Sequence, residues 1–102
     1  MKVLLLNGSP KANGNTAYAL SQMAEVFTAE GVEAEILHVG NQPIRGCIAC
    51  GSCRETGKCV FDDAVNQAAE AFREADGLVA ASPVYYASAN ATLVAFLDRL
   101  FY

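Results

Sequence analysis

Residues 8–16 form a loop rich in glycine, hydroxyl and amide side chains, between a short apolar run and a segment with helical periodicity. Where such a loop enters its helix, free backbone N–H groups and the positive end of the helix dipole favour a phosphate group. The spacing differs from the G-x-x-x-x-G-K-[ST] loop of nucleoside-triphosphate sites and from the G-x-G-x-x-G dinucleotide fingerprint. Short donors with one cation instead suit a single terminal phosphate. The candidate side chains are Ser9, Lys11, Asn13, Asn15 and Thr16.

The plain alternative for this loop is a tight turn from strand to helix, in which Asn15 or Thr16 only caps the helix. Capping alone needs one such residue, and the loop has several. On the same alternative, Lys11 is an ordinary exposed lysine.

Four cysteines, Cys47, Cys50, Cys53 and Cys59, lie within thirteen residues and have glycines among them. Compact thiolate spacing with glycines lets a backbone fold around a small inorganic cluster while its N–H groups point at the sulfurs. All four could hold one [4Fe–4S] centre, since the last gap of five residues and the missing proline differ from a two-cluster ferredoxin run. Zinc is the rival metal, although its structural sites favour two C-x2–4-C pairs with a longer separation. Reduced thiols or a disulfide are the third alternative.

The composition is that of one small folded domain. The chain has 102 residues, and its hydrophobic content of 53% argues against disorder. Its net charge of −4 argues against nucleic acid or an anionic membrane as partner. No apolar run approaches the ~20 residues that cross a membrane, and the N-terminus does not look like a secretory signal. We therefore expect a cytoplasmic protein, in which thiols stay reduced and metal or redox use of the cysteines is favoured.

Three apolar segments predict strands and three periodic segments predict helices. Residues 3–6 are uniformly apolar, which is typical of a central parallel strand covered on both faces. Residues 32–39 alternate and suit an edge strand, and residues 78–81 form the third apolar run. The predicted helices cover residues 16–30, the segment that follows the capping residues Asp62 and Asp63, and the chain from about residue 89.

Apolar side chains at helical spacing are assigned to the core of the domain. In the three predicted helices these are Leu20, Met23, Ala24 and Phe27; Val65, Ala68, Ala69 and Phe72; and Leu93, Phe96, Leu97 and Leu100. His38 is expected at a strand end or on the surface. Asp98 and Arg99, on the last helix, are expected to form a solvated pair.

The alternating order of strands and helices makes a parallel α/β sheet. Ligands of such sheets lie outside the carboxyl ends of the strands, and residues 8–16 and 82–88 both follow a strand there. The two loops become neighbours if the first and third strands pair. The chain ends on an apolar run without a polar cap, residues 100–102, and three strands leave a sheet edge open. We therefore expect the first part of a larger domain, or a homo-oligomer that completes itself.

Three motifs in this order resemble the flavodoxin-like NAD(P)H-dependent FMN reductases, and within them the iron–sulfur flavoproteins. They are N-G-S-P-K-x-N-G-N-T at 7–16, C-x-x-C-x-x-C-x5-C at 47–59, and S-P-V-Y-Y at 82–86 followed by F-L-D-R-L at 96–100. The resemblance covers the whole chain. It implies a single flavodoxin-like FMN-binding domain over residues 1–102, the N-terminal portion of the family's domain, with strand order 2-1-3, helices on both faces and a cysteine-rich loop at 41–61.

The resemblance also implies that the loop at 8–16 holds the FMN phosphate and that the loop after the third strand lies along the isoalloxazine ring. The ring contacts would be Pro83, Val84, Tyr85, Tyr86, Ala87 and Ser88. The family usually has glycine where this chain has Ala87, and aromatic packing at the strand end is the alternative for the two tyrosines. The cysteines would bind a cluster that exchanges single electrons with the flavin, although related flavoproteins can keep a similar loop without one.

We therefore expect an FMN-dependent oxidoreductase or electron-transfer protein, with NAD(P)H as the electron donor and a small molecule or protein as the exchange partner. No general acid, base or nucleophile is assigned, because the flavin carries the chemistry. Two other hypotheses are a non-catalytic flavodoxin-like carrier or assembly module, and a zinc-binding regulatory domain built on the cysteine loop.

Overall fold

A three-stranded parallel sheet, in the order β2-β1-β3, forms the centre of the molecule. The computed structural model describes residues 1–101, so the last residue of the predicted apolar chain end, Tyr102, lies outside the described residues. The strands are β1 (Lys2–Asn7), β2 (Glu33–His38) and β3 (Gly77–Ala81). The predicted order 2-1-3, with the first strand central and the second at an edge, is confirmed.

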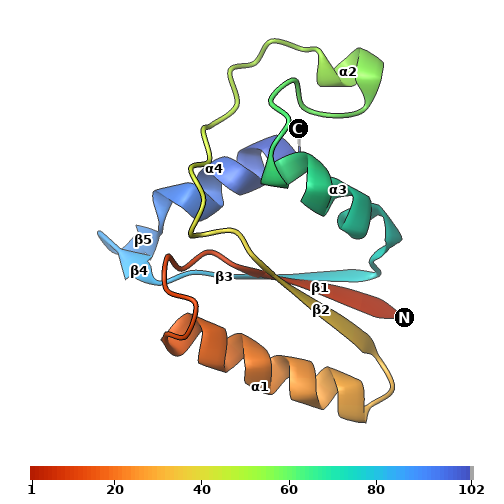
Figure 1. Cartoon of the computed structure of the whole chain (residues 1–102), viewed down its shortest axis with the longest axis vertical. Coiled ribbons are helices and arrows are strands. Elements are labelled where there is room, and N and C mark those ends of the chain that lie inside the picture. Colours follow the sequence, from red (N-terminus) through yellow and green to blue (C-terminus); the bar gives the residue numbers. More distant parts are fainter. Residues whose placement is uncertain (102) are drawn as a thin grey trace.

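Helices cover both faces of this sheet (Figure 1). α1 (Asn15–Ala29) lies on one face, and α3 (Ala64–Glu74) and α4 (Ala91–Leu100) lie on the other. A short helix, α2 (Cys53–Thr56), belongs to the cysteine-rich loop, which extends beyond α3 and α4 away from the sheet. Within residues 1–101, no helix is both long and apolar enough to span a bilayer.

The surroundings of β1 explain why its sequence is apolar without alternation. Leu4 and Leu6 belong to the larger core cluster, to which α3 and α4 contribute. Val3 and Leu5 belong to a second, smaller cluster with Leu20 of α1. Both faces of the strand are therefore covered, and each fully buried aliphatic side chain of this kind stabilises the fold by about 1.5–3 kcal/mol.

The start of α3 follows its local sequence signal, whereas the start of α1 does not. Asp63 caps α3, as predicted, by accepting the backbone N–H of Val65. α1 begins after Gly14 without a side-chain cap, so the alternative in which Asn15 or Thr16 caps this helix is wrong. Both residues already lie in the first turn of the helix, beyond the position from which a side chain accepts the first free N–H groups.

The predicted core position of Met23 is also wrong, because this side chain of α1 is 40% exposed. In the described part of the chain, α1 is the one helix on its face of the sheet (Figure 1). Only the side of its apolar stripe that packs on the sheet, at Leu20 and Phe27, is therefore covered. Val26, which is 63% exposed, lies beside Met23 on the open part of the helix.

Candidate functional site

The loop after β1 is fixed by hydrogen bonds within itself and from β2. The side chain of Asn7 accepts the backbone N–H of Ser9 at 2.9 Å, and the Ser9 hydroxyl accepts that of Lys11 at 3.1 Å. The ring of His38 places Nε2 2.7 Å from the Ser9 carbonyl, so Nε2 carries the proton in this contact. His38 is the last residue of β2, which confirms its predicted place at a strand end.

Gly40 packs directly against the same loop. Its backbone N–H donates to the carbonyl of Asn7 at 3.1 Å. A Cβ atom at this position would overlap the carbonyl of Gly8 and crowd that of Ser9. The turn after β2 therefore needs glycine because the backbone of the loop after β1 passes through the space that a side chain would fill.

Asn90 ties the loop after β1 to the segment after β3. Its side-chain amide donates to the carbonyl of Gly8, while its Oδ1 accepts the backbone N–H of Leu93 at 3.2 Å as the cap of α4. The Ser82 hydroxyl lies 3.2 Å from the same Oδ1 and accepts the backbone N–H of Asn90 at 2.9 Å. Asn90 is only 4% exposed, so one buried amide holds both loops in place.

The two predicted loops meet at one rim of the sheet. β1 and β3 pair in parallel, and the backbone N–H of Gly8 donates to the carbonyl of Ala81 at 2.8 Å. The expectation that residues 8–16 and 82–88 become neighbours through strand pairing is confirmed. Figure 1 shows both segments at the same end of the sheet.

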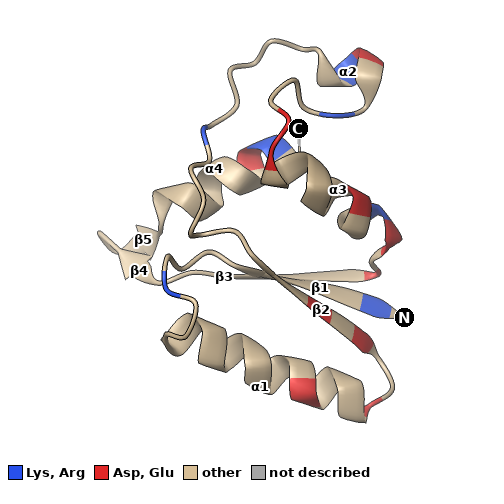
Figure 2. Ribbon diagram, in the orientation of Figure 1, with Lys and Arg blue, Asp and Glu red and all other residues tan. Residues whose placement is uncertain are grey.

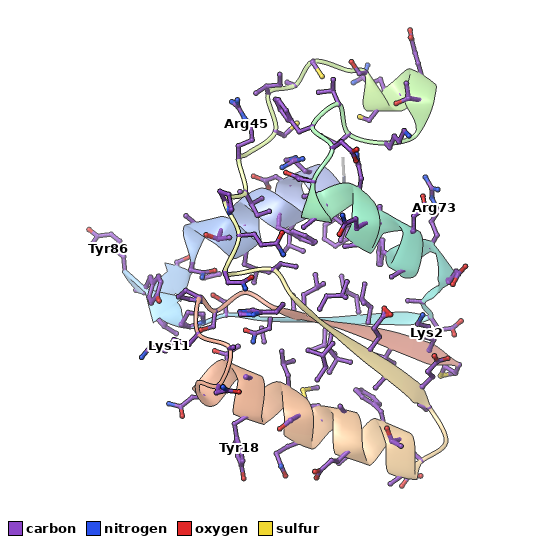
Figure 3. All side chains as sticks on the ribbon, viewed as in Figure 1. Lys2, Lys11, Tyr18, Arg45, Arg73 and Tyr86 are labelled. Atoms are coloured by element: carbon purple, nitrogen blue, oxygen red, sulfur yellow. The ribbon has the colours of Figure 1, made fainter. Side chains whose placement is uncertain are left out.

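The predicted phosphate residues differ in how far they reach solvent. Ser9 is buried, Thr16 is half-buried, and Lys11, Asn13 and Asn15 are exposed. Figure 3 shows Lys11 pointing outward from the rim. Because no side chain caps α1, the backbone N–H groups of its first turn are left to bind an anion.

The segment after β3 forms a small hairpin, β4 (Val84–Tyr85) paired with β5 (Ser88–Ala89). Its turn residues, Tyr86 and Ala87, have φ angles of 50° and 58°, a left-handed conformation that two-residue hairpin turns require and glycine adopts most easily. Residues 84–86 are exposed, and Figure 3 shows Tyr86 reaching away from the rim. An apolar, aromatic surface therefore lies open beside the loop.

Charge is unevenly distributed along the sheet (Figure 2). Acidic side chains gather toward the amino ends of the strands, on β2 and near the end of α3. The loop at residues 8–14, at the opposite end, carries one charged residue, Lys11. This polarity favours a negatively charged ligand at the rim where the two loops meet.

The cysteines surround one pocket outside α3 and α4. Cys47, Cys50, Cys53 and Cys59 all line it, together with Arg99. All four thiols are free, the first two exposed and the last two half-buried. Within residues 1–101, no three Cys, His, Asp or Glu side chains are arranged to hold a metal ion. The loop thus gathers its thiols around one pocket without bringing them to a single point.

Arg99 lies in this pocket, and its predicted solvated pairing with Asp98 is wrong. Arg99 is 6% exposed and forms a two-pronged ion pair with Asp63, at 2.8 and 2.9 Å. Burial by itself would lower the pKa of Arg99, but its hydrogen bonds and charge interactions with Asp63 and Cys59 outweigh burial and raise that pKa. Adjacent residues of a helix do not share a face, so Asp98 remains exposed while Arg99 turns inward.

Cys50 is a thiol whose surroundings favour the thiolate. Hydrogen bonding with the side chain and then the backbone of Ser52 lowers the pKa of Cys50, whose sulfur lies 3.5 Å from the Ser52 hydroxyl. Because the thiolate is the reactive form, we expect Ser52→Ala to slow the alkylation of Cys50 by iodoacetamide at neutral pH in the metal-free chain. Peptide mass spectrometry measures the rate, with Cys47 as the internal reference. Equal Cys50 rates in the two proteins would contradict this expectation.

Comparison with known protein families shows to which family the chain belongs. The model of the NADPH-dependent FMN reductases matches residues 1–102, the full length of the sequence. The chain belongs to this family. A solved structure, the apo form of an NADH:FMN oxidoreductase, is similar to this chain with a TM-score of 0.65 and 28% identity, and the match covers 97% of this chain and 49% of the other. The predicted flavodoxin-like fold is confirmed.

Curated relatives of this FMN reductase family member are iron–sulfur flavoproteins. The protein from Methanocaldococcus jannaschii is 35% identical over 97% of this chain and 51% of its own length. The protein from Methanosarcina thermophila is 35% identical over 97% of this chain and 52% of its own length. The chain therefore spans about half the length of these relatives. The predicted resemblance to the iron–sulfur type of the family is confirmed.

Sequence reasoning missed the structural roles of three residues that shape these sites. Asn90 carries a recognisable signal, since a short polar residue just before a helical apolar pattern marks a cap. Gly40 directly follows the second predicted strand, where a glycine only indicates a turn. Arg99 stands within the F-L-D-R-L segment that contributed to the resemblance, and nothing local to it predicts burial.

Proposed function

We propose that this chain binds FMN at the carboxyl edge of its sheet and serves an oxidoreductase that takes electrons from NAD(P)H. The observation that carries the proposal is the meeting, on one rim, of an uncapped helix start and an exposed aromatic hairpin. The first suits a phosphate and the second suits a flat apolar ring. Membership of the FMN reductase family and similarity to an NADH:FMN oxidoreductase support it.

In this proposal the two loops divide the FMN between them. The phosphate is bound by the first amides of α1 and by Ser9, Lys11, Asn13, Asn15 and Thr16. The ring lies along Pro83, Val84, Tyr85, Tyr86, Ala87 and Ser88. Bound FMN supplies the hydride and one-electron chemistry. The chain binds and orients it, and Asn90 and His38 hold the phosphate loop in its binding position.

We further propose that the cysteine loop is an iron–sulfur site. Its donor set is four thiols around one pocket, which suits iron and sulfide better than a hard cation. The ligands would be Cys47, Cys50, Cys53 and Cys59. The names of the iron–sulfur flavoproteins that the chain resembles support this assignment. The predicted electron-exchange partner, homo-oligomeric state and cytoplasmic location stay predictions.

The spectrum of the anaerobically purified chain, incubated with FMN, tests the function. We expect the two visible flavin bands, a broad iron–sulfur shoulder between them, and bleaching of the flavin when NADPH or NADH is added. Flavin bands without bleaching by either nucleotide would favour a non-catalytic carrier. A colourless protein with stoichiometric zinc would favour the regulatory domain, and a chain that retains no FMN would overturn the proposal.

The phosphate loop gives a direct mutational test. Thr16→Ala and Asn15→Ala are each expected to weaken FMN binding by about 1–2 kcal/mol, because each removes a hydrogen bond to a charged group. Quenching of FMN fluorescence during titration measures the affinity. Thr28→Ala, an exposed position at the other end of α1, is the matched control and is expected to bind as the wild type does. Unchanged affinity in both loop variants would remove these residues from the site.

A further inference from the structure

The guanidinium of Arg99 makes five hydrogen bonds, and its partners come from both ends of the cysteine loop. It donates to the carbonyl of Arg45 at 3.1 Å and to that of Phe61 at 3.0 Å. Two bonds hold the carboxylate of Asp63, and Nε donates to the sulfur of Cys59 at 3.3 Å. The loop between Arg45 and Phe61 is thus closed on a single side chain of α4.

Cys59 is held in two independent ways. Asn66 of α3 accepts the backbone N–H of Cys59 at 2.9 Å and donates to its carbonyl at 3.0 Å. Arg99 fixes the sulfur of the same residue. By contrast, Cys47 and Cys50 are exposed, and the hydrogen bonds of their sulfurs reach only two residues along the chain. One thiol is therefore anchored to the helices, while these two are carried by the loop.

We propose that Arg99, with Asn66, fixes Cys59 as the anchored ligand onto which the loop closes when it takes up a metal ion or cluster. The proposal rests on the metal site of the proposed function and deepens it by naming a positioning residue and a distinct ligand. Since two ends and one ligand are already ordered, less conformational entropy is lost when the remaining thiols close on the metal.

Arginine is suited to this role in a way that lysine is not. Its planar fork offers five donors, whereas an ammonium offers three from one point. The ion pair with Asp63 compensates the charge of a side chain that is fully buried. The Nε–H of the same side chain lies 3.3 Å from the sulfur of Cys59, where it orients this ligand.

Binding of Co²⁺ by variants of this chain tests the proposal, because Co²⁺–thiolate binding is visible in the absorption spectrum. Arg99→Gln is expected to weaken Co²⁺ binding about 10- to 100-fold, the usual cost of removing a partner that orients a ligand. The Co²⁺ affinity of Arg99→Lys is expected to lie between that of Arg99→Gln and that of the wild type. The control is Arg73→Gln, because Arg73 also donates to a loop carbonyl, that of Gly57 at 2.9 Å, but from an exposed position. Wild-type affinity in a folded Arg99→Gln chain would overturn the proposal.

Amide hydrogen exchange of the metal-free chain gives a second readout. The N–H of Cys59 donates to Asn66, so its protection reports the anchoring. Arg99→Gln is expected to lower that protection about tenfold while Leu5 in β1 keeps its own. Unchanged protection of Cys59 would overturn the role of Arg99. A wild-type chain that takes up no Co²⁺ would instead overturn the metal site itself, so the two failures are distinguishable.

If Arg99→Gln does not fold, as judged by circular dichroism and by hydrogen exchange in β1, the variant Asp63→Asn tests the proposal in its place. Asparagine keeps the cap of α3 but removes the ion pair with Arg99. Both Cys59 protection and Co²⁺ affinity are expected to fall. If Asp63→Asn and Arg99→Lys both match the wild type in the two measurements, the proposal is wrong.

Discussion

Replacing Gly40 with alanine is expected to displace the phosphate loop and to abolish measurable FMN binding. The new Cβ would overlap the carbonyl of Gly8, which is buried backbone and has no flexible end that could turn aside. Gly8 cannot move away easily, because Asn90 donates a hydrogen bond to its carbonyl and its own N–H donates to the carbonyl of Ala81. Overpacking of this kind costs about 1–3 kcal/mol of stability, and more where backbone must move.

Urea unfolding and an FMN titration of Gly40→Ala measure the two effects. Gly46→Ala is the matched control, because a Cβ at Gly46 meets no atom within 4 Å. The control is expected to unfold and to bind FMN as the wild type does. If Gly40→Ala also behaved as the wild type, the close approach of the two backbones would be refuted.

Replacing Asn90 with alanine is expected to lower the free energy of unfolding by about 2–4 kcal/mol and to weaken FMN binding. Part of the loss is the cap of α4, about 1 kcal/mol. The rest is the carbonyl of Gly8, which is buried and loses its side-chain donor, at about 1–3 kcal/mol. Binding weakens because the loop at 8–16 is then no longer tied to the segment after β3.

Two further variants separate these contributions. Asn90→Ser keeps an oxygen that caps α4 but cannot reach Gly8, so it is expected to recover only the capping part. Asn90→Asp keeps the cap and places a carboxylate against the Gly8 carbonyl, so it is expected to impair FMN binding more than it impairs the helix. Urea unfolding and FMN fluorescence measure both. Equal stability of the wild type and Asn90→Ala would contradict the buried tie.

The fold could be read from the sequence where a local pattern sets a global position. Residues 3–6 are apolar at every position, and only a strand covered on both faces permits this. The alternation at 32–39 placed the second strand at an edge, which leaves the third beside the first. That pairing alone brings the two loops to one rim, so the site followed from the topology.

What the sequence did not predict depends on contacts between distant residues. Asn90 bonds to a carbonyl 82 residues away, and Arg99 reaches a sulfur 40 residues away. The helical spacing of apolar residues predicts that Met23 lies in the core, but this spacing does not show how much of the surface of α1 is covered by other elements. Glycine is needed at position 40 because the backbone of Gly8 and Ser9 passes close to it, and no local sequence motif predicts this contact.

α4 carries an attachment point at each end, Asn90 for the phosphate loop and Arg99 for the cysteine loop. Asn90 and Arg99 are nine positions apart in the sequence, which at a rise of about 1.5 Å per residue is about 13.5 Å. The helix backbone therefore sets the distance between the loop that holds the proposed flavin and the loop that holds the proposed cluster. Substitutions on its outer side, at Val94 or Asp98, can change what the helix presents to other molecules without changing that spacing.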